Sequence, residues 1–285
     1  MENSKIKGKK LRALLPILAF LLLVVLVVYL IQPFMFFYPY HHEEAYTKLK
    51  EKDSFKEIII PHGKGQLHGW LRYHGEGERA PLLIFYGGNG QNSSYYSSLY
   101  EQMDVYSYFQ GYHVLFVDYP GYGLSDGSPT EKSLFSAGLA VYDYAQDMDC
   151  AGDKTVILGY SIGTGVASYV ASQREADGLI LLAPFDRGLS LYNDALNIFH
   201  GPLKALARFK FDSVTYARRI SVPTLIIASK ADEVIPYTHA QELSKHFSNL
   251  ADFVLTEDAS HDNFFFSQEI LEQIQTYLLI IQENS

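Results

Sequence analysis

Apolar and polar positions along this chain of 285 residues predict a regular succession of strands and helices. Short runs of branched and aromatic residues are typical of buried strands, and apolar residues every three or four positions are typical of helices. The runs predict strands near residues 57–61, 66–73, 81–86, 113–118, 154–160, 178–183, 223–229 and 253–257. The helical pattern covers residues 95–110, 131–148, 162–173, 237–248 and 263–281. This alternation predicts an α/β fold with a mostly parallel eight-stranded sheet, helices on both faces and an antiparallel edge formed by the first two strands.

The stretch between Asp186 and Arg219 is longer than a simple crossover requires and contains many large apolar residues. We expect this insertion, residues 186–219, to form a short helical cap over the ligand-binding edge of the sheet. Its basic residues Lys204, Arg208 and Lys210 favour a cap over the alternative, which is another crossover helix.

A second pattern marks the amino-terminal part of the chain. Residues 13–31 contain no charged residue and would extend about 28 Å as a helix, which is close to the thickness of a bilayer core. The twelve residues before them carry a net charge of +4, whereas the net charge of residues 39–56 is zero. The positive-inside rule then predicts a cytoplasmic amino terminus and a domain on the extracytoplasmic side. The alternatives are a buried core helix and a cleaved signal peptide, although no small-residue cleavage site follows.

These patterns predict four parts of the chain. They are a basic cytoplasmic tail over residues 1–12, a transmembrane anchor over 13–38, a linker over 39–54 and one α/β domain over 55–285. If the anchor lies in a membrane, the apolar face of the cap would line a hydrophobic pocket near that membrane.

Composition narrows the class of function. About 245 residues outside the anchor are enough for one large domain with a well-packed core. The total charge of −9 includes the +4 of the first twelve residues, so the rest of the chain carries −13. Such an acidic domain is a poor nucleic-acid binder. The single cysteine excludes an internal disulfide, and no zinc, EF-hand or P-loop spacing occurs, so we expect no metal and no cofactor. The oligomeric state stays open.

The candidate chemistry centres on the sequence Gly159-Tyr160-Ser161-Ile162-Gly163, between a predicted strand and a predicted helix. A serine at such a sharp turn exposes its hydroxyl, and the glycines avoid collisions with the neighbouring strand and helix. The backbone N–H of Ile162 would point toward an oxyanion beside Ser161. The pentapeptide alone is a weak motif that also fits a tight turn with a capping serine. Its position in the chain favours a nucleophile.

Two later loops supply the partners that a serine nucleophile needs. Asp232 and His261 each follow a predicted strand, at the same edge of a parallel sheet as Ser161, and ligands bind at that edge. A neutral imidazole can take the proton of the serine hydroxyl. A carboxylate then orients the imidazole and stabilises its charged form. The sequence therefore predicts Ser161 as nucleophile, His261 as base and Asp232 as the acid.

Other acidic residues compete with Asp232 or flank the histidine. Asp186 also follows a predicted strand and is the main rival for the acid, and Glu233 is the adjacent substitute. Asp258 and Asp262 would cap the helix that follows His261. Asp118 precedes the serine in the chain, so we expect it to hold the Pro120-Gly121-Tyr122-Gly123 turn by hydrogen bonds instead of taking part in chemistry.

The glycine-rich sequence Gly87-Gly88-Asn89-Gly90 follows the predicted strand near 81–86. Small residues there let backbone N–H groups approach a developing alkoxide, so the N–H of Gly88 or Asn89 is the expected second oxyanion donor. A dinucleotide-binding turn is the alternative, but only two of its three glycines are present.

Together these segments resemble the α/β-hydrolase superfamily, most closely its membrane-anchored abhydrolase-domain and serine-aminopeptidase-like hydrolases. The resemblance covers roughly residues 55–281 in the order of the family. The segments that carry the resemblance are residues 86–90, Val117–Pro129, the Ser161 motif, Asp232–Pro236 and Ser260–Phe264.

The resemblance implies a serine hydrolase with a catalytic triad and no cofactor, acting on a small or lipid-like acyl ester or thioester. A peptidase that binds a free amine through Asp186 or Asp194 is one alternative. A membrane-anchored binding or scaffold protein that lost activity is the other, and fold alone does not decide between them.

Overall fold

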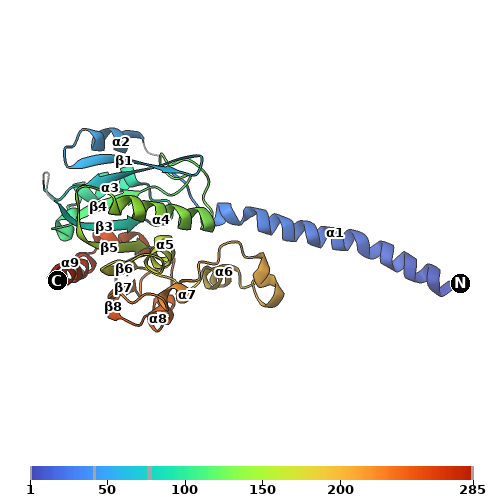
Figure 1. Cartoon of the computed structure of the whole chain (residues 1–285). Coiled ribbons are helices and arrows are strands. Elements are labelled where there is room, and N and C mark those ends of the chain that lie inside the picture. Colours follow the sequence, from blue (N-terminus) through green and yellow to red (C-terminus); the bar gives the residue numbers. More distant parts are fainter. Residues whose placement is uncertain (1, 41–42, 76–78, 284–285) are drawn as a thin grey trace.

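An eight-stranded sheet forms the centre of the domain (Figure 1). The structure, a computed structural model, describes residues 2–40, 43–75 and 79–283. The strands are β1 (Phe55–His62), β2 (Gly65–Arg72), β3 (Ala80–Tyr86), β4 (His113–Val117), β5 (Ala151–Tyr160), β6 (Gly178–Leu182), β7 (Thr224–Ser229) and β8 (Leu250–Thr256). Their order is β1-β2-β4-β3-β5-β6-β7-β8. The pairs β1–β2 and β2–β4 are antiparallel and all others are parallel, which confirms the predicted sheet and its antiparallel edge.

Helices cover both faces of this sheet. Alternate residues of the central strands fall into two separate cores, because successive side chains of a strand point to opposite faces. In β6, for example, Leu181 belongs to one core and Leu182 to the other. The first core contains side chains of α4 (Glu131–Gln146), α5 (Ile162–Ala171) and α8 (Tyr237–Ser244). The second contains side chains of the 3₁₀-helix η1 (Val105–Phe109), α3 (Ser93–Gln102) and α9 (Gln268–Glu283).

Two predicted helices differ from the observed elements. The helix predicted near 95–110 is divided, because Asp104 takes a left-handed conformation with φ of 56° between α3 and η1. The helix predicted near 263–281 begins only at Gln268, and the 3₁₀-helix η3 (His261–Phe266) precedes it. Asp262 therefore lies in the first turn of η3, away from the start of α9. The apolar spacing is similar in both kinds of helix, so it did not distinguish them.

The amino-terminal segment is a single helix, α1 (Glu2–Phe36), that extends away from the domain (Figure 1). Its stretch Leu15–Phe34 has a mean hydropathy of 2.8 and is almost wholly exposed. This stretch is a candidate transmembrane span by length and composition, properties that a signal sequence shares. Within the predicted linker, the short helix α2 (Glu43–Lys50) packs against α3 and β1.

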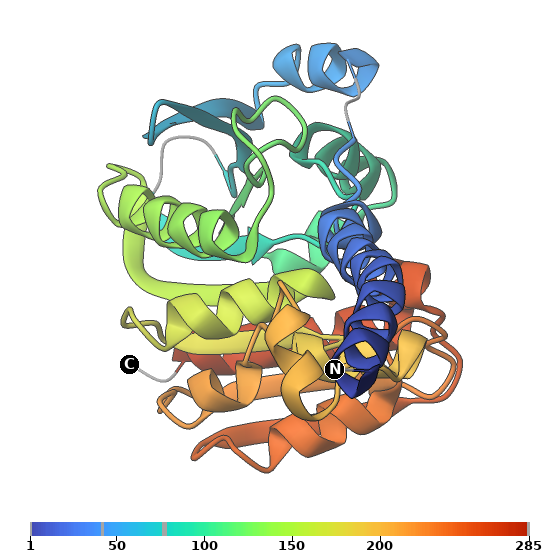
Figure 2. The same ribbon diagram turned by 90° about the vertical axis from the view of Figure 1, so that its right-hand side faces the viewer.

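The insertion after β6 contains α6 (Gly188–Leu196), the 3₁₀-helix η2 (Gly201–Leu206) and α7 (Ser213–Ala217). An isolated antiparallel bridge joins Arg187 to Asp212 and closes the base of the inserted loop. After this bridge, α7 packs against α5. The name "cap" is used below for residues 187–210, which include α6 and η2. The cap lies on the side of the domain from which α1 leaves (Figures 1 and 2), and α9 lies on the opposite side (Figure 1).

One buried hydroxyl connects α9 to the sheet, and it offers a test of the packing. Tyr277 Oη accepts a hydrogen bond from the N–H of Leu179, at 3.1 Å, and donates one to the carbonyl of Pro223, at 2.6 Å. We expect Tyr277→Phe to lower the free energy of unfolding by about 1 kcal/mol in urea titrations, because a net hydrogen bond is worth that much.

The matched control is Tyr108→Phe, since the hydroxyl of Tyr108 has no hydrogen-bond partner within the described ranges. This variant should change the free energy of unfolding by much less. Equal losses in the two variants would show that the Tyr277 hydroxyl does not connect α9 to the sheet.

Candidate active site

Ser161 lies at the turn between β5 and α5, where its backbone has φ of 53° and ψ of −122°. Residues with a side chain rarely adopt this conformation, and it occurs where the surrounding structure enforces it. A Cβ atom on Gly163 would lie 2.0 Å from the carbonyl oxygen of Tyr86, and one on Gly159 would lie 2.7 Å from the carbonyl oxygen of Gly163. The two glycines therefore let β5, α5 and β3 approach closely enough to form the turn.

The structure brings the three residues predicted for the triad together. His261 Nε2 lies 3.0 Å from Ser161 Oγ, and His261 Nδ1 lies 2.8 Å from Asp232 Oδ2. The Asp232 side chain is almost fully buried, and that of His261 is 9% exposed. Because the Asp232 carboxylate accepts a hydrogen bond from Nδ1, it favours the tautomer of His261 that is protonated at Nδ1. The Nε2 atom is then free to accept a proton from the hydroxyl of Ser161.

Neighbouring groups fix the positions of the acid and the imidazole. Asp232 Oδ1 accepts hydrogen bonds from the N–H groups of Val234 and Ile235, at 2.9 and 2.8 Å. The Tyr160 ring stacks on the His261 ring with centroids 5.4 Å apart, and its hydroxyl donates to the His261 carbonyl. Burial raises the pKa of Tyr160 well above its usual value, so this hydroxyl stays a neutral donor.

The glycine-rich loop after β3 lies beside the serine, and its two candidate donors differ. The N–H of Gly88 donates to Gln91 Oε1 at 2.7 Å, so a side chain of the same loop already engages it. Asn89 lines the same cavity as Ser161, and its Oδ1 accepts from the Tyr38 N–H at 2.9 Å. Ile162, whose backbone N–H is the other candidate donor, follows Ser161 directly and is the first residue of α5. The loop thus offers backbone donors at the edge of the sheet where the triad lies.

Ser161 and His261 open into a cavity of about 690 Å³. Most of its wall is aromatic or aliphatic, and the cap contributes Leu191 and Asp194. The other lining residues include Tyr38, Tyr160, Phe185, Val234, Ile235, Phe265 and Phe266. A cavity of this size and polarity is typical of a site for a small organic ligand. Across the described ranges, no group of three or more His, Cys, Asp or Glu side chains could hold a metal ion.

Comparisons with known proteins agree with this fold. The family model described as the alpha/beta hydrolase fold matches residues 80–215. The structure is similar to Est1E from Butyrivibrio proteoclasticus, solved with ferulic acid, with a TM-score of 0.66 and 20% identity over 79% of this chain and 99% of that one. The chain has the α/β-hydrolase fold, and these matches support an α/β-hydrolase superfamily hydrolase. A second neighbour, the Pyrococcus furiosus esterase Pf2001, has a TM-score of 0.65 and 17% identity over 86% of this chain and 98% of that one.

Two curated relatives are named as alpha/beta hydrolase domain-containing proteins. Human alpha/beta hydrolase domain-containing protein 17B is 26% identical over 236 residues, which are 80% of this chain and 77% of that protein. The Caenorhabditis elegans protein aho-3 is 26% identical over 182 residues, 62% of this chain and about half of its own length, 53%. Together with the fold, these matches support a hydrolase.

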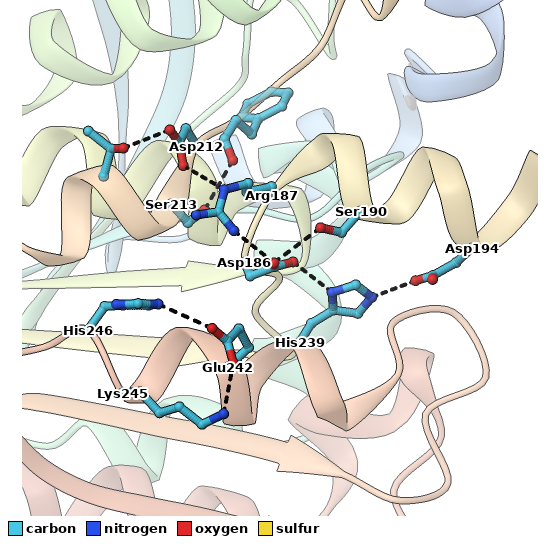
Figure 3. A network of polar contacts seen from close by, with 12 residues as sticks. Asp186, Arg187, Ser190, Asp194, Asp212, Ser213, His239, Glu242, Lys245 and His246 are labelled. Atoms are coloured by element: carbon cyan, nitrogen blue, oxygen red, sulfur yellow. Dashed lines mark hydrogen bonds and ion pairs between the residues drawn. The ribbon is translucent and has the colours of Figure 1, made fainter. Parts of the chain in front are cut away.

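The rival acid of this α/β-hydrolase, Asp186, belongs to a different cluster (Figure 3). Its Oδ1 lies 2.7 Å from Nδ1 of His239 on α8, and His239 Nε2 lies 2.5 Å from Asp194 Oδ2 on α6. Burial alone would lower the pKa of His239, but its hydrogen bonds to the two carboxylates outweigh burial and raise the pKa above 6.5. Burial likewise opposes ionisation of Asp186, yet the hydrogen bond with His239 lowers the pKa of that carboxyl. The bridged histidine therefore links the cap to the body of the domain.

The remaining candidate residues have structural contacts. Asp118 accepts hydrogen bonds from the N–H groups of Ser93, at 2.5 Å, and Leu124, at 3.3 Å, so it holds the turn that follows it. Glu233 accepts from the backbone N–H of His261 at 3.3 Å instead of from its ring. Neither Gln91 nor His239 was predicted as a site residue, because no motif marks either of them, and both partners of His239 lie far from it in the chain.

The His239 bridge predicts a dependence of stability on pH. Because its folded-state pKa is raised, its stabilising contribution is complete below about pH 6.5 and is lost as the pH rises through that raised value. We expect His239→Gln to melt at a lower temperature than the wild type near pH 6, and the difference in Tm to narrow toward about pH 9.

His246→Gln provides the control, since His246 lies just beyond the same helix and its ring has one polar partner in the described ranges, the side chain of Glu242 at 3.4 Å. A difference between wild type and His239→Gln that stays constant with pH would contradict the assignment of a charged bridge.

Proposed function

We propose that this protein is a membrane-anchored serine hydrolase that cleaves acyl esters or thioesters. The observation that carries the proposal is the position of the His261 ring, within hydrogen-bonding distance of both Ser161 Oγ and Asp232 Oδ2 at the mouth of an apolar cavity. The esterases among the structural neighbours support the same class of reaction.

In the proposed reaction, Ser161 Oγ attacks the substrate carbonyl while His261 Nε2 takes the hydroxyl proton. The tetrahedral intermediate collapses when His261 returns this proton to the leaving alcohol or thiol, and an acyl-enzyme remains. Water then attacks the acyl group with His261 again as base, which releases the carboxylic acid and restores the serine. Asp232 stays ionised and stabilises the imidazolium in both halves.

Backbone donors would stabilise the oxyanion of each tetrahedral intermediate. Ile162 N–H is the first, and of the two candidates in the glycine-rich loop Asn89 is favoured, because Gln91 already accepts from Gly88. The apolar walls formed by Phe185, Leu191 and Phe265 suit an acyl chain. This lining supports an ester or thioester with a hydrophobic acyl group, without the need for a cofactor.

The stretch Leu15–Phe34 would anchor the protein in a membrane. Its length of 20 residues corresponds to about 30 Å of helix, which matches a bilayer core. The basic residues before it favour a cytoplasmic amino terminus and a hydrolase domain on the other side.

The two alternative functions have less support. A peptidase would need a free carboxylate to bind a substrate amine, and both Asp186 and Asp194 are already hydrogen-bonded to His239. A scaffold protein would have no need to retain the buried Asp232 carboxylate against the imidazole of His261.

A fluorophosphonate probe tests the proposed nucleophile. We expect the wild type, in detergent-solubilised membranes, to become labelled and Ser161→Ala to remain unlabelled. The same variant should lose at least about 10⁴-fold in kcat toward an acyl ester, since the whole triad acts through this hydroxyl. Ser136→Ala, on an exposed part of α4, is the control and should label normally. A folded wild type that resists the probe would refute the proposal and favour the scaffold function.

The identity of the acid predicts a contrast between two variants. Asp232→Asn should lower kcat toward the same ester by about 10⁴-fold, because an amide opposite Nδ1 favours the wrong tautomer of His261. Asp186→Asn should retain most of the activity. A larger loss in Asp186→Asn than in Asp232→Asn would assign the role of the acid to Asp186, in the loop after β6.

A further inference from the structure

A single polar side chain connects the candidate span to the cap. Gln32 lies in the last turns of α1 and is only 1% exposed. Its Oε1 accepts hydrogen bonds from the Tyr192 hydroxyl and the Arg208 N–H, at 2.8 and 2.9 Å, and its Nε2 donates to the Leu206 carbonyl at 2.9 Å. Each of these three partners belongs to the cap, so the cap is attached directly to α1.

Further contacts define where along α1 the cap lies. The Arg208 guanidinium lies 4.9 Å from the centre of the Tyr29 ring, and Phe37 packs edge-on against Phe209 at 4.7 Å. Tyr29 and Gln32 are inside the apolar stretch that ends at Phe34. At 1.5 Å per residue, the contact at Tyr29 lies about 8 Å inside the end of the span, a depth typical of elements that enter the boundary between headgroups and acyl chains.

The cap segment differs in net charge from the rest of the chain. Residues 187–210 contain four basic residues and one acidic residue, a net charge of +3 in a chain whose total is −9. Lys204 is exposed, beside Leu203, which is 47% exposed, and Ile198 is 43% exposed. A surface that combines basic and apolar side chains suits the boundary between anionic headgroups and acyl chains.

We propose that the cap is a lipid-binding surface that docks on an anionic bilayer through Ile198, Leu203 and Lys204. The inference rests on the proposed insertion of α1, since Gln32 fixes the cap relative to that helix. Docking holds the mouth of the cavity at the headgroup layer, because the cap residue Leu191 and Tyr38, just after α1, both line the cavity. A lipid-borne acyl group would then reach Ser161 without crossing bulk water.

Tryptophan quenching by brominated lipids tests this docking in the full chain. The protein is reconstituted in vesicles of phosphatidylcholine and phosphatidylglycerol with brominated acyl chains. The variants Ile198→Trp and Leu203→Trp report on the cap, and the wild type, whose only tryptophan, Trp70, is 1% exposed in the core, supplies the baseline. Leu250→Trp is the matched control, since Leu250 is 37% exposed at the amino end of β8, whereas the cap follows the carboxyl end of the parallel strand β6.

We expect brominated lipid to reduce the fluorescence of both cap variants and to leave that of Leu250→Trp unchanged. The loss should be smaller in vesicles of phosphatidylcholine alone and in a second variant that adds Lys204→Glu. If the loss of fluorescence is the same in the two lipids and is unchanged by Lys204→Glu, the basic residues have no role in docking. Cap variants that respond no more than Leu250→Trp would overturn docking. A blue-shifted but unquenched signal would do the same, because it would place protein, such as a second copy of the chain, over the cap.

Leu22→Trp separates this inference from the proposed anchor. Leu22 lies in the middle of the span, so brominated lipid quenches its variant if α1 inserts, whatever the cap does. Quenching at this position without quenching at the cap overturns docking and leaves the anchor intact. If brominated lipid quenches neither Leu22→Trp nor the cap variants, both the membrane anchor and the docked cap are overturned.

Discussion

The backbone of Ser161 is the constraint on which the arrangement of the site depends. Its positive φ of 53° reverses the chain between β5 and α5 within one residue, at a cost of about 1–3 kcal/mol. The turn fits only because Gly163 packs directly on the carbonyl of Tyr86 at the end of β3. The same contact brings the glycine-rich loop after β3 to the serine. One strained residue thus positions the hydroxyl, the N–H of Ile162 and the loop with the second donor.

The other groups of the site come from loops that hold one another in place. The loop after β7 presents Asp232, whose second oxygen is bound by its own backbone, and η3 presents His261 on the ring of Tyr160. The glycine-rich loop after β3 is fixed by Gln91 and by the contact between Asn89 and the backbone of Tyr38. The chain that leaves α1 therefore supports the active site directly, so the candidate span and the site form one unit.

The sequence predicted the sheet, its order of elements and the three residues now found together at Ser161, because each of these follows from local pattern. Buried strands read as apolar runs, and the chemistry-bearing residues follow strands whose ends meet at one edge. The break at Asp104 and the 3₁₀ turn at His261 were not predicted, since both depend on how nearby side chains pack. The contacts of His239 and Gln32 were also missed. Each joins residues far apart in the chain, and only the folded structure brings them together.

Those two missed side chains explain how the cap keeps its position over the cavity. A glutamine in an apolar helix is unfavourable in a membrane unless its amide is hydrogen-bonded, and the cap supplies three partners of Gln32. His239 holds the other side of α6 through Asp194. With polar contacts on both sides, the cap has little freedom to move as a hinged lid. The width of the cavity is then set by side chains such as Leu191. Under the proposed function, substitutions there would change the choice of acyl chain more than the rate of chemistry at Ser161.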